Sequence, residues 1–234
     1  MTTRALLLSL AVLAMRGVTS AQEELNTLPQ ESAMKTIKLP APSMKGATSL
    51  EEALLKRRSV RAYREAPLTM EEISQLLWAA QGITEKDKGL RTAPSAGALY
   101  PLEVYMVVGN VTGLAKGVYQ YRPHEHILVK VAEEDVRKEV SHAALDQESV
   151  RDAPAVLVFS AVMERTAVKY GTRTARYVYM EAGHAAQNVF LQATALNLGT
   201  VVVGAFYDEE VKKVIGMDAG ESALSIMPVG RRAM

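Results

Sequence analysis

The feature that most constrains the fold of this chain is an unbroken apolar run, Ala155 to Phe159. A strand with one face in water alternates apolar and polar residues, whereas a strand buried on both faces reads as a continuous apolar run. The valines and the phenylalanine of the run also favour a strand. The run therefore predicts a central strand of a sheet that is covered on both faces.

Helical and strand patterns interleave irregularly around this run. Ser49 and Thr69 each begin a capping box, because a glutamate follows three residues later, and the second helix is expected to stop at Gly82. The longest helical stretch runs from residue 173 to 196, and no internal repeat is present. This arrangement predicts the α+β class. The other expected elements are strands over 104–108, 200–205 and 223–229, a hairpin of 118–121 and 127–131, and helices over 133–144 and 208–215.

The composition is that of a globular protein of one domain, or of two small ones, with 234 residues of which 48% are hydrophobic and 23% charged. A net charge of +1 argues against nucleic acid as a partner, because nucleic-acid binding needs a basic face. The absence of cysteine excludes disulfides, a thiolate nucleophile and iron–sulfur clusters. We expect no metal site: His124 and His126 flank a hairpin tip, where a solvated turn is favoured over a metal-binding pair.

The N-terminal segment has the pattern of an export signal. Arg4 precedes the apolar run 5–15, and small residues at 19–21 offer a cleavage site before Gln22. The run is shorter than the roughly 20 residues needed to span a bilayer, so cleavage is favoured over a retained anchor and no stable membrane span is expected. We therefore expect a signal peptide over 1–21, an extended arm over 22–48, a folded domain over 49–234, and an exported protein of the periplasm or cell envelope.

Two arginine clusters lie near the ends of the predicted domain. The first is Arg57-Arg58-Ser59-Val60-Arg61, the second is Gly230-Arg231-Arg232, and an apolar-rich strip over 94–101 lies between them. A planar guanidinium meets two phosphate oxygens at once, and a strip of glycine and alanine lets a flat ring lie close to backbone. The pattern indicates a phosphorylated aromatic cofactor. The alternative for the first cluster is a solvated helix C-terminus, where positive charge is favourable in any case.

A series of spaced motifs includes both clusters and the strip. They are Arg57 to Arg61, Leu76 to Gly82, Arg91 to Glu103, Lys169 to Gly171, Arg176-Tyr177, Glu181 to Asn188 and Pro228 to Arg231. Together they resemble the motifs of the nitroreductase superfamily. More narrowly, they resemble its SagB-type dehydrogenase branch, which includes the enzymes that oxidise azolines to azoles in peptide natural products. The resemblance extends from about residue 36 to residue 232.

This resemblance implies a nitroreductase-like, FMN-binding α+β fold with a central mixed sheet flanked by helices. It also implies an obligate homodimer with active sites at the subunit interface, and ping-pong hydride transfer through flavin N5. Two-electron reduction of a flavin leaves negative charge across N1 and O2, which a fixed cation stabilises. The sequence therefore predicts an FMN-dependent oxidoreductase.

Matching positions imply particular roles around FMN. Residues 57–59 would hold the phosphate and ribityl chain together with residues 231–232, and Arg61 would lie near the N1–O2 edge. Residues 94–98 would cover the ring from the partner subunit, and residues 203–205 would supply backbone groups near N5. The implied cofactor-binding residues are Arg57, Arg58, Ser59, Arg61, Pro94, Ser95, Ala96, Gly97, Ala98, Val203, Gly204, Ala205, Arg231 and Arg232.

Lys169 and Tyr170 are the candidate catalytic pair. In the azole-forming branch, a Lys-Tyr pair at this motif is implicated in removing the substrate proton while hydride leaves to FMN. A lysine acts as a base only where burial or a nearby cation lowers its pKa. The alternative is structural, with both residues capping or packing the long helix that follows. His184, in the middle of that helix, is expected to be a buried histidine rather than a base.

Three readings of the function remain open. The first is an FMN-dependent oxidoreductase acting on a small or peptidyl substrate. The second is a nitro or quinone reductase with NAD(P)H as donor; no dinucleotide-binding glycine motif is present, but a donor that binds transiently over the flavin needs none. The third is a non-enzymatic flavin carrier or sensor, which needs the phosphate-binding residues but no acid–base pair. Azoline oxidases work beside cyclising partners in the cytoplasm, whereas export is expected here, so the branch does not name the substrate.

Overall fold

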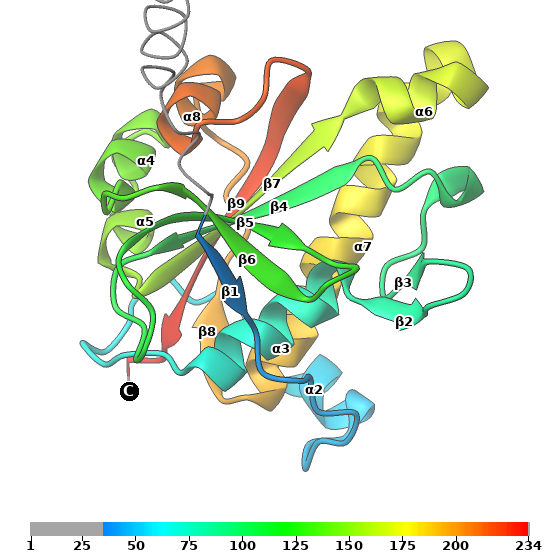
Figure 1. Ribbon diagram of the computed structural model, residues 1–234. Helices are drawn as coiled ribbons and strands as arrows, with labels where there is room; N and C mark the ends of the chain where they lie inside the picture. Colours follow the sequence, from blue (N-terminus) through cyan, green and yellow to red (C-terminus); the bar gives the residue numbers. More distant parts are fainter. Residues whose placement is uncertain (1–34, 234) are drawn as a thin grey trace, which may run out of the picture. The chain divides into compact units, whose positions relative to one another are not determined.

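The structure, a computed structural model, describes residues 35–233, which form a seven-stranded sheet with helices on both faces (Figure 1). The strand order is β1-β6-β5-β4-β7-β9-β8, and β2 and β3 form a separate hairpin. All neighbouring strands of the sheet pair antiparallel, so the sheet is not mixed as the resemblance implied, and parallel pairing within the described residues is confined to isolated bridges. The strands are β1 (Thr36–Lys38), β2 (Ile83–Glu85), β3 (Leu90–Arg91), β4 (Leu102–Val108), β5 (Gly117–Arg122), β6 (Ile127–Ala132), β7 (Ala155–Val162), β8 (Leu198–Thr200) and β9 (Glu221–Arg231).

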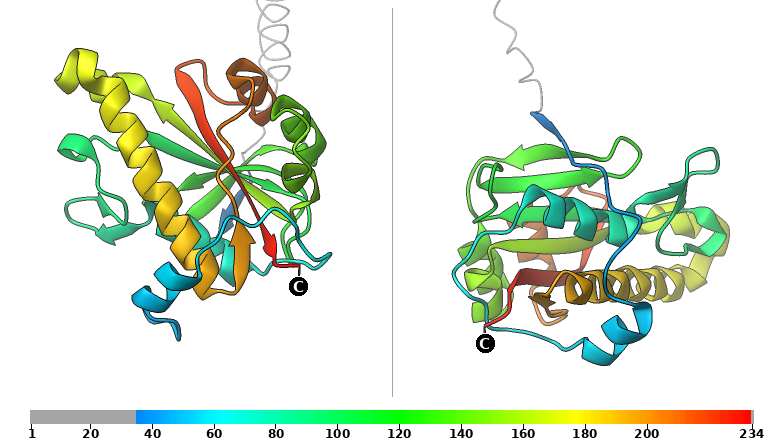
Figure 2. Two further views of the ribbon diagram at one scale, coloured as in Figure 1. Left: turned by 180° about the vertical axis from the view of Figure 1, so that it is seen from behind. Right: turned by 90° about the horizontal axis from the view of Figure 1, so that it is seen from below.

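Two groups of helices cover the two faces of the sheet, so the predicted α+β class is confirmed (Figure 2). One hydrophobic cluster joins the sheet to α3 and α7, and a second joins it to α4, α5 and α8. The helices are α2 (Leu50–Lys56), α3 (Met70–Gln81), α4 (Arg137–Ala143), α5 (Glu148–Asp152), α6 (Met163–Tyr170), α7 (Thr174–Ala195) and α8 (Asp208–Ile215), with short 3₁₀ turns η1 (Ala96–Ala98) and η2 (Gly171–Arg173).

Strand β7 is the central buried strand that the apolar run predicts. It lies between β4 and β9, and its side chains alternate between the two clusters. Ala155, Leu157 and Phe159 pack on the α3–α7 side, whereas Val156 and Val158 pack on the α4–α5–α8 side. Because both faces of β7 are covered, no position along the run is left for a polar residue.

Local signals place most of the helix ends correctly. Thr69 and Glu72 form the complete capping box of α3, and the helix ends before Gly82 as predicted. Ser49 accepts the Glu52 N–H at the start of α2. The predicted hairpin is confirmed as β5 and β6. Two elements are shorter than expected, because α4 begins only at Arg137 and the strand predicted over 200–205 ends as β8 at its first residue.

The described part of the predicted arm contributes an edge strand. β1 pairs antiparallel with β6, so the sheet takes in residues that precede the first helix. The expected signal peptide, residues 1–21, and residues 22–34 of the arm lie outside the described residues. Within residues 35–233, no helix is both long enough and apolar enough to cross a membrane.

Candidate active site

The first arginine cluster lies where α2 ends. Arg57 caps α2, and its guanidinium lies 5.2 Å from the centre of the Phe190 ring on α7. Arg58 is exposed, and its Nη1 donates to the carbonyls of Leu55 at 3.0 Å and of Arg57 at 2.7 Å. Within the described residues, neither these arginines nor the exposed Arg61 form an ion pair. Their charges are therefore available to an anionic ligand.

Backbone pairing brings the second arginine cluster beside the first. Ser59 forms a parallel bridge with Thr200, and the Val60 N–H donates to the Thr200 carbonyl at 2.9 Å. This close approach needs glycine at position 199, because a Cβ there would lie 2.6 Å from Val60 Cγ1. Gly199 pairs in turn with Gly230 in β9, next to the C-terminal arginines. Segments far apart in the sequence thus meet at one place.

The C-terminal arginines already have partners at this place. The guanidinium of Arg231 donates to Glu72 from Nη1 to Oε1 at 2.8 Å and from Nη2 to Oε2 at 3.0 Å. The same Glu72 carboxylate accepts the Thr69 N–H in the capping box of α3. Arg232 donates from Nε to the Leu198 carbonyl at 3.0 Å. Arg231 and Arg232 therefore bind the last residues of β9 and the segment after it to the rest of the fold. This structural role was not part of the prediction, which gave them only a contact with phosphate.

A phosphate would find three arginines and a hydroxyl around the end of α2. Arg57, Arg58, Ser59 and Arg61 lie in one segment, and the last three are exposed. Guanidinium and hydroxyl groups are the donors that suit a phosphate, so the residues present fit the phosphate end of FMN. The bonds of Arg58 to the last carbonyls of α2 are also what a solvated helix C-terminus predicts, so this arginine has a structural role as well.

The segment Val203–Ala205 lies in a loop that follows β8. Val203 exchanges both backbone hydrogen bonds with Ile226, at 2.8 and 3.0 Å, so its amide is already used. Gly204 and Ala205 are exposed. Of the three residues predicted to supply backbone groups near flavin N5, Gly204 and Ala205 are the ones on the surface.

The strip Pro94–Ala98 forms a tight loop with an unusual backbone. Gly97, Ala98 and Tyr100 have φ of 63°, 55° and 46°, in the left-handed region that non-glycine residues rarely adopt. The Ser95 hydroxyl accepts the Tyr100 N–H at 2.9 Å and so closes the loop. Pro94, Gly97 and Ala98 are exposed, so the loop presents its apolar atoms outward.

Lys169 and Tyr170, at the end of α6, lie directly against this loop. A Cβ added to Gly97 would lie 2.9 Å from Tyr170 Oη and 3.0 Å from Lys169 Nζ, so the ends of both side chains lie against the backbone of the loop. The Tyr170 ring contacts the Tyr177 ring edge-on, with centroids 4.7 Å apart. Lys169 is exposed. The structure therefore joins the predicted catalytic pair to the predicted ring-covering strip of the same chain.

The predicted site residues thus form two groups near opposite ends of α7. Tyr170 contacts α7 at Tyr177, whereas Arg57 contacts it at Phe190. At about 1.5 Å per residue, these contacts are roughly 20 Å apart along the helix axis. Within one chain, the residues predicted to bind phosphate and the Lys169–Tyr170 pair are therefore well separated.

A buried polar cluster behind the strip was not predicted as part of the site. The Arg91 guanidinium lies 4.6 Å from the centre of the Tyr100 ring. Glu103 accepts from Arg165 at 2.6 Å, and Glu181 on α7 is only 2% exposed. Burial raises the pKa of Glu181 to about 7. The sequence contained a signal for this cluster, because Glu181 is a charged residue on the face of a helix whose other residues are apolar and belong to the core.

Two histidines differ from the sequence-based expectation. His126, expected in a solvated turn, bonds Tyr121 Oη through Nδ1 at 2.8 Å, and its Nε2 lies within bonding distance of Ser74 Oγ and the Pro40 carbonyl. Burial lowers the pKa of the His126 imidazole. His184, expected to be buried, is exposed, because it lies on the outer face of α7. Within residues 35–233, no three metal-ligating side chains gather.

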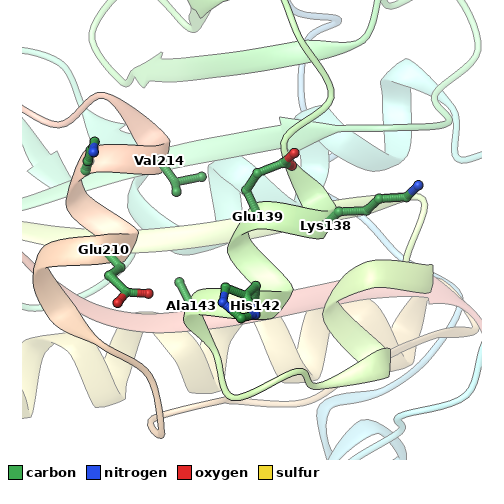
Figure 3. A pocket seen from close by; sticks show the side chains of 7 residues that line it. Lys138, Glu139, His142, Ala143, Glu210 and Val214 are labelled. Atoms are coloured by element: carbon green, nitrogen blue, oxygen red, sulfur yellow. The ribbon is translucent and has the colours of Figure 1, made fainter.

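A hollow of about 580 Å³ lies between α4 and α8 on the other side of the sheet (Figure 3). It contains none of the predicted site residues. Most of its lining side chains are polar and exposed, although Ala143 and Val214 also line it, and His142 pairs with Asp146 at 3.1 Å beside it. The hollow is open, and no buried polar group among its lining residues points into it to bind a ligand. Its lining residues are Lys138, Glu139, His142, Ala143, Glu210, Lys213 and Val214.

Comparison with known proteins gives a consistent result. The model of the family described as the nitroreductase family matches residues 54–231. A protein of Methanocaldococcus jannaschii whose name calls it a nitroreductase is 51% identical over 183 residues, which cover 78% of this chain and 91% of the relative. The microcin B17-processing protein McbC of Escherichia coli is 30% identical over 156 residues, which cover 64% of this chain and 57% of McbC.

A solved structure supports the same assignment of the fold. A crystal structure from Anabaena variabilis, named as that of a nitroreductase, superposes with a TM-score of 0.76 at 33% identity. The match covers 86% of this chain and 42% of that one, so this chain spans less than half of its length.

Proposed function

The chain belongs to the nitroreductase family and is an oxidoreductase, and from that premise we propose that it uses FMN and handles its substrate proton with Lys169 and Tyr170. The observation that carries this proposal is the contact of both side chains with the strip at Gly97. A proton-handling pair is useful only beside the ring that takes the hydride, and the strip is the part of the chain proposed to cover that ring.

The phosphate of FMN would be held at the end of α2. Arg57 and Arg58 supply charge, and Ser59 supplies a hydroxyl at the start of the parallel bridge with Thr200. Arg61 would place a further positive charge near the ring. Bound FMN would supply a two-electron acceptor and donor, which no side chain of this chain offers. The fit of the exposed donors to a monophosphate supports FMN over a cofactor without phosphate.

A homodimer would bring the two groups of site residues together. Since they lie roughly 20 Å apart along α7, a cofactor held at the end of α2 would meet the strip and Lys169–Tyr170 of a second subunit. Leu54 and Leu55 on α2 and Tyr179 and Met180 on α7 are 52%, 74%, 60% and 54% exposed. These apolar side chains lie on adjoining helices (Figure 2) and would be buried in such a dimer.

The same association would prepare Lys169 for its role. The side chain is exposed in the single chain, and a lysine acts as a base only where burial or a nearby cation favours its neutral amine. A second subunit and a substrate lying over the loop would exclude water from it. Tyr170 would then orient or receive the proton, because its ring is held in place by Tyr177 at 4.7 Å.

The substrate class proposed first is a small or peptidyl molecule whose oxidation removes a proton and a hydride together. McbC, to which this chain is similar, is named for the processing of microcin B17, and this supports a peptidyl substrate. The export signal expected over residues 1–21 supports a location in the periplasm or cell envelope. Mass spectrometry of the mature N-terminus tests this location, with Gln22 as the expected first residue.

A second candidate function is an NAD(P)H-dependent nitro or quinone reductase. The 51% identity to a protein that is named as a nitroreductase favours it. A non-enzymatic flavin carrier is less well supported, because a carrier has no use for an acid–base pair at the strip.

Anaerobic reduction of the FMN-loaded protein discriminates between the two candidates. The first predicts that an azoline-containing peptide bleaches the flavin absorption while NADH and NADPH do so slowly. The second predicts rapid bleaching by a nicotinamide donor and reoxidation by a quinone. A protein that binds no FMN at all would overturn both.

A further inference from the structure

Tyr100, at the end of the loop that the strip forms, is held at three of its polar groups. Its backbone is left-handed, with φ of 46°, and a residue with a Cβ keeps such an angle only where its surroundings hold it. Its N–H donates to Ser95 Oγ at 2.9 Å, and its Oη accepts the Arg91 N–H at 3.2 Å. Its carbonyl accepts from Nη1 of Arg165 at 3.2 Å. Ser95 and Arg91 are near neighbours in the sequence, whereas Arg165 reaches the loop from α6, 65 positions away.

Arg165 also joins α6 to the sheet. Its Nη2 lies 2.6 Å from Oε1 of Glu103, in the strand β4 that follows the loop. Glu103 is 9% exposed, and its other carboxylate oxygen accepts from Gln120 Nε2 on the neighbouring strand β5 at 3.2 Å. Since this carboxylate is largely out of water, the ion pair is screened less than one on the open surface. One guanidinium therefore binds both the strained loop and the sheet.

Helix α6 has little apolar packing of its own to fix its position. It has eight residues, all within the described part of the chain, and of these Thr166 alone is buried. A helix this short is not stable by itself in water, so its contacts with the rest of the protein decide where it lies. Arg165 and Lys169 are four positions apart, which places their side chains on one face of the helix, about 6 Å apart along its axis. This face is turned toward the loop, because Lys169 lies against Gly97 there.

We propose that Arg165 is a positioning residue for Lys169 and Tyr170. Its ion pair with Glu103 and its bond to the Tyr100 carbonyl hold the face of α6 that carries the pair against the loop. Without the guanidinium, this face moves away from the loop. The positioning itself needs no cofactor, whereas its effect on catalysis rests on the proposed function.

A nuclear Overhauser effect (NOE) between Gly97 and Tyr170 tests the positioning. A Cβ at Gly97 would lie 2.9 Å from Tyr170 Oη, so the glycine hydrogen that points the same way lies beside the ring. In the isotope-labelled protein, we expect an NOE between this Hα and the ring protons of Tyr170. Arg165→Ala should lose it. Arg173→Ala, which removes an exposed arginine from the turn η2 directly after α6, is the matched control and should keep it.

A second variant separates loss of the contact from loss of folding. Arg165→Ala leaves the buried Glu103 carboxylate without its ion-pair partner, which destabilises the fold. The double variant Arg165→Ala/Glu103→Gln removes that unpaired charge, and it should lose the NOE as well. If the single variant does not fold, the double variant decides. An NOE of wild-type intensity in a variant without Arg165 would overturn the proposal, as would the absence of the NOE from the wild type.

Turnover of an azoline-containing peptide distinguishes positioning from substrate binding. Arg165→Ala should lower kcat about 100-fold with little change in KM, the cost of misplacing a catalytic group by about 1 Å. In a Lys169→Ala background the same substitution should cause no further loss, because Arg165 acts through the pair.

Two kinetic results would contradict the positioning role. A raised KM together with a full additional loss in the Lys169→Ala background would make Arg165 a substrate-binding residue. An unchanged kcat in an Arg165→Ala protein that has lost the NOE would also overturn the role. The NOE needs neither flavin nor substrate, so failure of FMN binding would overturn the proposed function and leave the NOE result intact.

Discussion

Arg231 and Glu72, 159 positions apart in the sequence, form a two-bond ion pair with N–O distances of 2.8 and 3.0 Å. The pair joins the end of β9 to the first turn of α3, where the Glu72 carboxylate also caps the helix. An arginine predicted to bind phosphate is therefore a structural residue as well. We therefore expect substitutions in the C-terminal cluster to lower folding stability, and substitutions in the first cluster to lower the affinity for FMN.

Arg231→Ala should destabilise the protein. It leaves the half-buried Glu72 carboxylate without its partner, and loss of a charged hydrogen-bonded pair of this kind costs about 1 to 3 kcal/mol. Urea unfolding of the FMN-free protein measures the change in the free energy of unfolding. Arg122→Ala, at an exposed position on β5, is the control and should change it little. An unchanged midpoint in Arg231→Ala would show that the pair contributes nothing in solution.

Arg57→Ala should weaken FMN binding without a comparable loss of stability. Arg57 forms no ion pair within residues 35–233, and its guanidinium contacts the Phe190 ring. The main interaction that the substitution removes is therefore a charge-assisted bond to the phosphate. We expect the Kd for FMN to rise about ten- to a hundredfold. Fluorescence titration measures the Kd, and riboflavin, which lacks the phosphate, is the control ligand. Equal losses for FMN and riboflavin would contradict a phosphate-binding role.

Lys169→Ala and Tyr170→Phe should slow substrate oxidation by about 100- to 10,000-fold, the scale of a lost general acid or base. The reason is that both side chains lie at the strip, while neither belongs to the hydrophobic core. Flavin content, melting temperature and reduction by dithionite should stay unchanged. Nitro or quinone turnover that survives both substitutions would favour the second candidate function. A parallel loss of flavin and melting temperature would make the pair structural.

Glu181 should make folding stability fall as pH rises from about 4.5 to 7. Its folded pKa, about 7, lies above the unfolded value of 4.5, so the folded state binds the extra proton in this window. The stabilising contribution is complete below pH 4.5 and is lost as pH rises through 7, by at most about 3 kcal/mol. Urea unfolding of wild type and Glu181→Gln between pH 5 and 8.5 measures it as a difference in slope. Parallel pH profiles would contradict the raised pKa.

Leu55→Glu should dissociate the proposed homodimer and release FMN with it. A carboxylate on the exposed apolar surface of α2 would have to be buried without a partner, which is strongly unfavourable. Light scattering with simultaneous flavin absorption measures both events. Val131→Glu, on β6 next to the edge strand β1 and away from α2 and α7, is the control and should stay dimeric. A wild-type monomer that carries FMN would refute the composite site.

Local patterns in the sequence determined much of the fold. The apolar run of β7, the Thr69–Glu72 capping box and the hairpin of β5 and β6 depend on neighbours within a few residues, so their physical causes are visible in the chain. The motif resemblance likewise identified the nitroreductase family, which the comparisons confirm. Within the candidate site, it named the Lys169–Tyr170 pair and the strip that the structure brings into contact.

Only the tertiary structure decided how these residues are used. The partner of Arg231 and the burial of Glu181 depend on packing between distant segments, and no local pattern encodes them. The exposure of His184 has the same origin, because the face of α7 that meets the core is set by the sheet and α3. A sequence records which side chains are charged, whereas their neighbours, and hence their pKa and freedom to bind a ligand, arise when the elements pack.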